Sequence, residues 1–315
     1  MARRLVDGGY QVRALARKGS KTDALKELGV EIALGDLGDE SSVAAAIDGV
    51  DIVVHAAAGT SGTARDSETA TIQGTRSVLK ACKATAVNKL VYISSCNVYE
   101  VAGCAENDVV TEEAQLERFA FRRGHYTAAK LEAERLVTAA INEGGCPIVV
   151  LRPGTLYGSG GEVYTKMIGI SFARRIFIVF GDGSGELPLV HVENAVDAIV
   201  ECITNKAADN QVFNVVDHEV ITKKTYIERV VKTLYPGAKV FYCPMSLLIA
   251  FTAIQEKIAT ILGTRPFLTV YRLLSSQRQI RYSTSKICRA TGWRPRARFA
   301  QFAEQLPEEV RAQTA

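Results

Sequence analysis

The order of hydrophobic and polar residues predicts strands that alternate with helices over the first half of the chain. Three apolar segments (10–16, 30–34 and 50–55) are predicted strands, and the first of them follows the end of a helix at 2–7 that Gly8-Gly9 closes. Ser20 or Thr22 would cap a short helix through Leu28, and Asp39 is typical of the N-cap of a helix over 40–47. The remaining predicted elements are a helix from about Glu68 to Thr85, a strand that ends at Ser95, a helix around Tyr126 and a strand at 147–152.

Alternation at this spacing is typical of βαβ units and therefore of an α/β fold with a doubly wound parallel sheet. The nearly continuous apolar runs at 51–54 and 148–151 fit strands that are covered on both faces. From Gly158 onward the alternation loosens. We therefore predict a first domain at 1–158 and a smaller α/β lobe at 159–315, with 188–217 either in the second or packed back onto the first.

The second half of the chain contains fewer clear signals of helices and strands. Residues 189–194 open a predicted helix through Thr204, and 212–216 form one more predicted strand. The segment from Pro244 to Leu262 is the most apolar helix candidate, but its internal polar residues make it too polar for a membrane span, which needs about 20 mostly apolar residues. We expect a helix that buries its apolar face in the second lobe, with a membrane-surface helix as the less favoured alternative.

Composition places the chain among ordinary soluble proteins. Of its residues 47% are hydrophobic and 23% are charged, and a net charge of +4 is too small to imply nucleic acid. The seven cysteines are scattered without a Cys-x-x-Cys pair, and the four histidines lack the spacing of metal ligands, so we expect reduced thiols, no metal site and a cytoplasmic location. No apolar segment typical of a signal peptide follows Met1.

Tyr126 and Lys130 are the strongest candidates for chemistry. Side chains four residues apart on a helix share one face, so both can point into one pocket. A phenol has an unperturbed pKa of about 10, and a neighbouring ammonium would lower it. The pair could then exchange a proton with an alcohol oxygen. In isolation the motif is better explained by a half-buried tyrosine beside a solvated lysine.

Three further segments give the motif a context. A strand ends at Ser95, four residues before Tyr99; another ends in Arg152-Pro153-Gly154; and Gly292-Trp293 lies near the C-terminus. In this order, the segments resemble the extended short-chain dehydrogenase/reductase family, also called the NAD-dependent epimerase/dehydratase family. The resemblance runs from about the first residue to Trp293 and implies a Rossmann-type fold in which 1–158 binds a dinucleotide and the second lobe binds a small-molecule substrate.

The resemblance also implies roles for individual residues. Ser95, Tyr126 and Lys130 would be catalytic, and Lys130 would also bind the ribose of the nicotinamide. The cofactor would lie across the carboxyl ends of the strands, against residues that the resemblance places there: Arg17, Asp36, Leu37, Ala56, Ala57, Ala58, Lys130 and Pro153.

The choice of cofactor depends on Arg17. An arginine after the second strand of the family's sheet can accept the 2′-phosphate of NADP, where a carboxylate would favour NAD. We therefore predict NADP, with NAD as the alternative. The alternative for Arg17 is a solvated basic loop, and for Asp36 it is the capping of a local turn.

One family feature is missing. The family begins with a strand and a Gly-x-x-Gly-x-x-Gly turn that holds the pyrophosphate, whereas Gly8-Gly9 precedes a strand. Without that central strand, the strands at 10–16 and 50–55 either pair with each other or leave their inner edges open. We expect poor solubility and weak binding of NADP or NAD by the chain as written, and an in-frame upstream segment that encodes the missing strand and turn.

The residues around the motif reduce the number of reactions that the enzyme could catalyse. Cys96-Asn97 stands where sugar dehydratases have Asp-Glu, and neither residue can act as a carboxylate acid or base. The Arg152–Gly158 segment and the apolar 244–262 segment resemble the steroid dehydrogenase and dihydroflavonol reductase branches. The prediction is an NAD(P)-dependent enzyme that interconverts a secondary alcohol and a ketone on a fairly apolar, steroid- or flavonoid-like substrate.

Two alternatives remain open. One is a nucleotide-sugar epimerase with the same three catalytic residues. The other is a non-catalytic nucleotide-binding or scaffold protein, against which the presence of Ser95, Tyr126 and Lys130 argues. A homodimer is a further possibility that the resemblance raises, through helices near 70–85 and 126–142.

Overall fold

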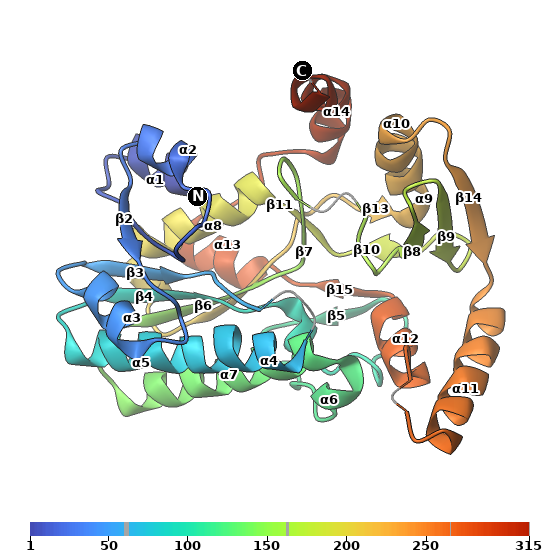
Figure 1. Cartoon of the computed structure of the whole chain (residues 1–315), viewed down its shortest axis with the longest axis horizontal. Helices are drawn as coiled ribbons and strands as arrows, with labels where there is room; N and C mark the ends of the chain where they lie inside the picture. Colours follow the sequence, from blue (N-terminus) through green and yellow to red (C-terminus); the bar gives the residue numbers. More distant parts are fainter. Residues whose placement is uncertain (60–62, 162–163, 265, 315) are drawn as a thin grey trace.

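The computed structural model describes residues 1–59, 63–161, 164–264 and 266–314, with the backbone alone at 307–314. Figure 1 shows two parts side by side: a parallel sheet with helices above and below it, and a smaller lobe in which short strands pack with helices α9 to α12.

The central sheet has four parallel strands in the order β12-β6-β4-β3. Its strands are β3 (Ile52–His55), β4 (Lys89–Ile93), β6 (Ile148–Pro153) and β12 (Val212–Val215). Side chains of a strand alternate between the two faces of the sheet. In β6, Val149 and Leu151 therefore enter one hydrophobic cluster while Ile148 and Val150 enter another.

Helices cover both faces of this sheet. The first cluster is formed with α1 (Ala2–Asp7), α8 (Val192–Thr204) and α13 (Ser285–Thr291), and the second with α3 (Glu40–Ile47), α5 (Gly74–Ala84) and α7 (His125–Glu143). Burial of both faces explains why the strand sequences are continuous Ile, Val and Leu runs. The predicted α/β fold with a parallel sheet is thus confirmed.

The first two strands of the chain are separate from the central sheet. β1 (Arg13–Ala16) and β2 (Glu31–Leu34) form a separate parallel pair, with α2 (Asp23–Glu27) between them in sequence. Within the described part of the chain, β1 is hydrogen-bonded to β2 alone and β3 to β4 alone. Of the two arrangements expected from the sequence, the structure has the one in which the two edges stay open.

Short pairs of strands join the two lobes. They are β7 (Thr155–Tyr157) with β11 (Leu189–His191), β10 (Glu186–Leu187) with β13 (Ile221–Thr222), and β5 (Asp108–Val110) with β15 (Ile280–Tyr282). Because β12 pairs with β6, part of the 188–217 segment lies in the central sheet. The division of the chain into two domains at 158 stays a prediction.

The smaller lobe is built on the three-stranded sheet β14-β9-β8. Its elements are β8 (Gly169–Phe172), β9 (Ile176–Phe180), α9 (Lys223–Tyr226), a π-helix η4 (Ile227–Val231), α10 (Lys232–Leu234), β14 (Lys239–Cys243), α11 (Met245–Ile261), α12 (Val270–Gln277) and α14 (Phe299–Thr314). Its hydrophobic cluster includes Phe177 and Val179 of β9 and Phe299 and Phe302 of α14.

Local sequence signals determine where several helices begin and end. The Asp39 carboxylate accepts a hydrogen bond from the Ser41 amide and caps α3, as predicted. The helix expected from Glu68 to Thr85 is instead three segments: α4 (Ala64–Asp66), a π-helix η1 (Ser67–Gln73) and α5. Among the described residues, no helix has the length and apolar character needed to cross a membrane.

The apolar 244–262 segment is a helix, α11, but the expectation that its apolar face belongs to the core is wrong. Only Thr252 and Ala259 of this helix are buried. Phe251 is 70% exposed and Ile261 75% exposed. The helix lies at the margin of the smaller lobe, where too little protein surface surrounds it to cover that face (Figure 1).

Asn194 and Trp293 fasten the C-terminal segment to α8. The Asn194 amide, 1% exposed, accepts hydrogen bonds from the backbone amides of Arg296 and Ala297, at 2.8 and 2.9 Å. It donates to the Asp217 carboxylate (2.7 Å) and to the Ala297 carbonyl (2.9 Å). The indole of Trp293 in turn donates to the Asn194 carbonyl (3.0 Å).

We therefore expect Asn194→Ala to lower the free energy of unfolding by about 2–4 kcal/mol, because several buried polar groups lose their partner at once. Asn142→Ala, at an exposed position of α7, is the matched control and should change stability by less than about 0.5 kcal/mol. Denaturant titration of both variants measures the difference, and equal effects would show that the Asn194 contacts contribute little.

Candidate active site

Ser95 and Tyr126 meet at the carboxyl end of β4. Ser95 lies just beyond that strand, and its hydroxyl accepts a hydrogen bond from the Asn97 amide (3.2 Å) as the cap of a 3₁₀ turn, η2 (Cys96–Val98). Tyr126 lies in the first turn of α7, which follows Gly124 with its positive φ of 105°. The Ser95 side chain is close enough to the Tyr126 phenol to lower its pKa by hydrogen bonding. The structure thus brings together the two groups that the sequence predicts to act on one substrate oxygen.

Lys130 lies one turn further along α7. Its side chain is 2% exposed, and its ammonium donates a hydrogen bond to the Ile93 carbonyl (2.7 Å) and lies 5.4 Å from the centre of the Tyr92 ring. Burial lowers the pKa of Lys130 to about 8, although the Glu134 carboxylate favours the charged form. Lys130 is therefore a buried cation at neutral pH rather than a solvated surface lysine.

The pKa of Tyr126 moves in the direction opposite to the prediction. Burial raises the pKa of the phenol, while the hydrogen bond with Ser95 acts to lower it. Lys130 does not contribute to this shift, and its ammonium donates to the Ile93 carbonyl. The phenol is therefore protonated at neutral pH.

His55 is a member of this cluster that the sequence analysis did not single out. It ends β3, is buried, and its Nε2 lies 3.0 Å from the Thr75 hydroxyl. Burial, together with the Lys130 charge, lowers the pKa of His55 to about 3, so the imidazole is neutral at pH 7. The only signal in the sequence was its position directly before Ala56, at the carboxyl end of a strand.

A buried ion pair joins α7, the helix of Tyr126 and Lys130, to β6. Glu134 and Arg152 interact at 2.5 Å, with side chains only 2% and 5% exposed. Ser94 donates a further hydrogen bond to Glu134, and Arg152 donates to the Tyr99 hydroxyl (2.6 Å). Tyr99 in turn donates to the Asn214 side chain of β12 (2.6 Å). The spacing of Glu134 from Tyr126 and Lys130, eight and four residues, was the signal that could have placed it on the same face.

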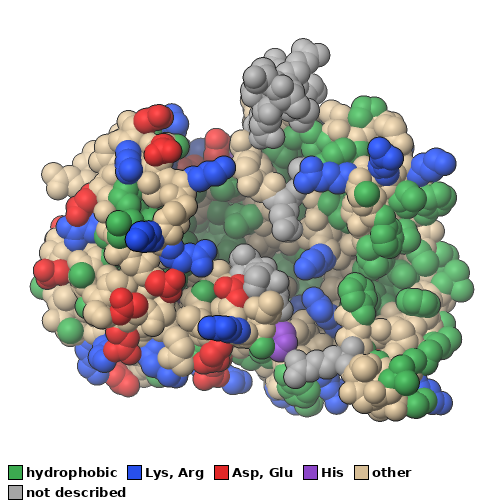
Figure 2. Space-filling view, viewed as in Figure 1, with side chains coloured by type: hydrophobic (Ala, Val, Ile, Leu, Met, Phe, Trp, Pro, Cys, Tyr) green, Lys and Arg blue, Asp and Glu red, His purple; other side chains and the backbone are tan. Residues whose placement is uncertain are grey.

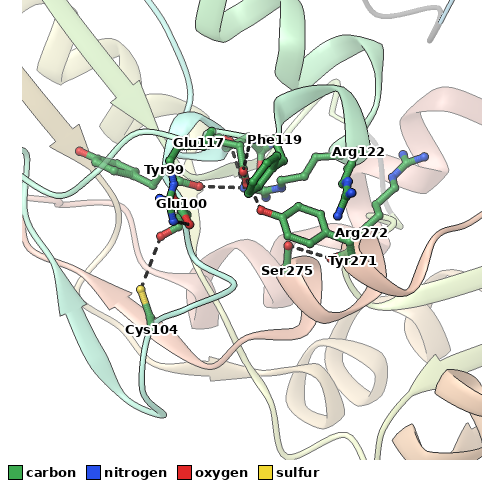
Figure 3. A network of polar contacts seen from close by, with 12 residues as sticks. Tyr99, Glu100, Cys104, Glu117, Phe119, Arg122, Tyr271, Arg272 and Ser275 are labelled. Carbon is green, nitrogen blue, oxygen red and sulfur yellow. Dashed lines mark hydrogen bonds and ion pairs between the residues drawn. The ribbon is translucent and has the colours of Figure 1, made fainter.

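A second buried carboxylate, that of Glu117, joins the smaller lobe to the loop that follows Ser95 (Figure 3). Glu117 accepts a hydrogen bond from the Tyr271 hydroxyl of α12 (2.6 Å) and lies 3.6 Å from the Arg123 guanidinium. Arg123 donates to the carbonyls of Tyr99 and Asn97, at 2.9 and 3.1 Å. The loop that carries Ser95 is therefore connected to α12 through one carboxylate.

The predicted cofactor residues fall into two groups. Ala56, Ala57 and Ala58 follow β3, and Pro153 ends β6, so these small or rigid residues share the carboxyl edge of the central sheet with Ser95. Ala56 and Ala57 are exposed there. A nicotinamide and its ribose fit this edge because Lys130 provides a buried donor and the alanines leave the approach open.

The other group belongs to the separate β1–β2 pair. Arg17 follows β1 and is exposed, as is Asp36 after β2. The Asp36 carboxylate accepts a hydrogen bond from the Gly38 amide (2.8 Å), which is the local turn capping considered as its alternative. Leu37 packs against Gly74 of α5. Gly8-Gly9 lies between α1 and β1, so it does not follow a strand as a phosphate-binding turn does.

Comparison with known proteins identifies the family. The family model for the NAD dependent epimerase/dehydratase family matches residues 1–215. The chain is 32% identical over 198 residues to a 2-alkyl-3-oxoalkanoate reductase of Stenotrophomonas maltophilia, a match that covers 62% of this chain and only 58% of that protein. It is 25% identical over 299 residues to a putative dihydroflavonol 4-reductase of Synechocystis, covering 93% and 85% of the two chains.

Solved structures share the fold. The UDP-glucose 4-epimerase of Thermotoga maritima superposes with a TM-score of 0.73 at 18% identity, over 99% of this chain and 94% of that one. The family model covers more than half of the chain, and the dihydroflavonol reductase-like relative confirms the predicted branch. The chain therefore belongs to the NAD dependent epimerase/dehydratase family, a family of nicotinamide-dependent enzymes.

Proposed function

We propose that the protein is an NAD(P)-dependent oxidoreductase that interconverts a secondary alcohol and a ketone, with Ser95, Tyr126 and Lys130 as its catalytic residues. The Ser95 hydroxyl close to the Tyr126 phenol, one helical turn from the buried Lys130 ammonium, is the observation that carries this proposal. It is the arrangement needed to hold and protonate one oxygen atom. The nicotinamide, when bound, supplies or accepts the hydride.

The protonation states favour ketone reduction at neutral pH. The Tyr126 phenol, its pKa raised by burial, holds the proton that a carbonyl oxygen must gain when it becomes an alcohol. Ser95 donates a second hydrogen bond to the same oxygen and so orients the carbonyl. Lys130 lies one turn further along α7 as a buried cation and, by resemblance to the family, would bind the ribose of the nicotinamide.

The residues next to Ser95 argue against dehydration. Cys96 is buried with its thiol against the Arg152 carbonyl (3.1 Å), and burial raises the pKa of that thiol. The position after the catalytic serine thus has no group that could remove a proton beside a ketone. An apolar ketone as substrate is supported by the reductase relatives, whose names specify an oxoalkanoate and a dihydroflavonol.

We further propose NADP as the preferred cofactor, on the basis of Arg17 after β1. Its guanidinium is exposed and therefore available to a 2′-phosphate. A nucleotide-sugar epimerase remains the second candidate because it would use the same three side chains and the same fold.

We expect Tyr126→Phe to lower the rate of ketone reduction by about 10²- to 10⁴-fold while cofactor affinity changes only a few-fold, since the phenol acts on the substrate proton. NADPH oxidation is to be followed with a panel of apolar ketones, and with UDP-sugars to test the epimerase alternative. Tyr10→Phe, in the cluster beside α1, is the matched control. A loss below tenfold for Tyr126→Phe would remove this residue from the mechanism.

The Lys130 pKa predicts how stability depends on pH. The lysine pKa is about 8 in the folded protein and 10.5 when unperturbed. Between these values the unfolded chain binds a proton that the folded chain does not, so the free energy of unfolding rises with pH. Relative to Lys130→Met, the natural protein should gain about 3 kcal/mol between pH 7.5 and pH 10.5, since one pKa unit corresponds to about 1.4 kcal/mol. Urea titrations of both proteins measure this difference, and parallel pH profiles would contradict a buried, charged Lys130.

Replacing Arg17 tests the cofactor preference. Arg17→Asp should shift the ratio of kcat/KM for NADPH over NADH towards NADH by about tenfold or more, because a charge-assisted hydrogen bond contributes about 1.5–3 kcal/mol. Lys26→Asp makes the same change of charge on α2 and should leave the ratio within about twofold. An unchanged ratio for Arg17→Asp would assign Arg17 to the solvated surface.

A further inference from the structure

The exposed side of α11 carries a row of large apolar side chains. Leu247, Phe251, Ile254, Ile258 and Ile261 recur at intervals of four and three residues, which places them on one face of the helix. Each of them is more than half exposed. Scattered exposed apolar residues are normal in soluble proteins, but a continuous stripe along four turns is a feature of interaction surfaces.

The sheet that leads into α11 continues this apolar surface. Strand register places Phe241 opposite Ile178, and Ile176 opposite Phe172, on the face of the β14-β9-β8 sheet that points away from the buried Phe177. Phe241 is 54% exposed and Phe172 52% exposed. An edge sheet with one solvated face normally alternates apolar and polar residues. This sheet has apolar residues on both faces.

Figure 2 shows the same surface in space. Hydrophobic side chains gather over β8, β9, β14 and α11, while the acidic side chains visible from this direction lie over the dinucleotide-binding part. We call the surface formed by Phe172, Ile176, Phe241, Leu247, Phe251, Ile254, Ile258 and Ile261 the apolar face.

Basic residues border the apolar face. Arg174, Arg175 and Lys239 line a groove of about 610 Å³ beside Ile176, at the tip of the β8–β9 hairpin. Lys257 lies on α11 next to Ile258 and is exposed. Within the described part of the chain, none of these four cations forms an ion pair with an acidic side chain. Between Thr222 and Gly263 the sequence has six Lys or Arg and two Glu, so the surplus of positive charge is local.

We propose that the apolar face binds the surface of an anionic lipid bilayer. Helix α11 would lie along the interface, with its row of apolar side chains in the region where headgroups meet acyl chains, as in other interfacial amphipathic helices. Arg174, Arg175, Lys239 and Lys257 would contact the phosphate groups of the lipids. Basic residues near such a surface add to binding and make it dependent on salt.

Charge favours a bilayer over a second copy of this chain. In a two-fold symmetric dimer the same surface patch faces itself. The four cations at the rim would then meet the same four cations of the other copy, and like charges brought together oppose association. An anionic bilayer instead offers opposite charge at the rim and an apolar interior at the centre.

The test is vesicle flotation with the full chain. Vesicles of phosphatidylcholine with phosphatidylglycerol are compared with vesicles of phosphatidylcholine alone, at low and at high salt. We expect binding to the anionic vesicles that weakens with salt. Phe251→Ser with Ile258→Ser should weaken it at least about tenfold, since burying one such side chain contributes about that factor or more. Leu34→Ser with Val109→Ser, two other exposed apolar positions, is the matched control and should bind within about twofold of the natural protein.

Two double charge-reversal variants separate binding to anionic lipids from non-specific hydrophobic adsorption. Arg174→Glu with Lys239→Glu should lower binding by about fivefold or more for each residue, whereas Lys21→Glu with Lys26→Glu should not. The proposal is overturned if no vesicle binds, if each control loses as much as its test variant, or if neutral vesicles bind as well as anionic ones. It is also overturned if ultracentrifugation shows a dimer that Phe251→Ser with Ile258→Ser abolishes in a chain that binds no vesicles, because the apolar face would then join two copies.

Discussion

The buried ion pair between Arg152 and Glu134 is the contact on which the positions of Tyr126 and Lys130 relative to the central sheet depend. It joins β6 to α7, and the Ser94 and Tyr99 hydroxyls complete the hydrogen bonds of the two charges. Replacing one member alone would leave a charge buried without its partner, at a cost of about 3–5 kcal/mol. Because Tyr126 and Lys130 lie on the same helix as Glu134, the ion pair also fixes the rotation of that helix relative to Ser95.

Sequence patterns could predict the parts of this protein that follow from local rules. The Asp39 cap, the strand runs of the central sheet and the course of α7 each result from signals within a few residues, and the structure confirms them. Spacing could place Tyr126 and Lys130 on one face of a helix, whereas Ser95 was assigned to the same site by resemblance to the family. Their roles in catalysis stay a prediction.

What sequence reasoning missed depends on neighbours distant in the chain. The pKa of Tyr126 is set by burial and by the Ser95 side chain, and neither effect could be deduced from a spacing of four residues. The exposure of α11 likewise depends on distant parts of the chain. The sequence of a helix shows which of its faces is apolar, but not whether other elements of the fold cover that face. Glu117 contacts Arg123 and Tyr271, and Tyr271 is 154 residues away in the chain.

The position of Glu117 limits how the two lobes can move. A hinge motion that carried α12 away would remove the Tyr271 donor from a Glu117 oxygen that still accepts a hydrogen bond from the Phe119 amide, at a cost of about 0.5–1.5 kcal/mol. This contact alone therefore disfavours separation of α12 from the loop by about two- to tenfold. The Phe119 ring lies edge-on against the Tyr271 ring, with 6.2 Å between the ring centroids, and would separate from it in the same motion. The hydrogen bond and the aromatic contact would therefore break and form together, as one unit.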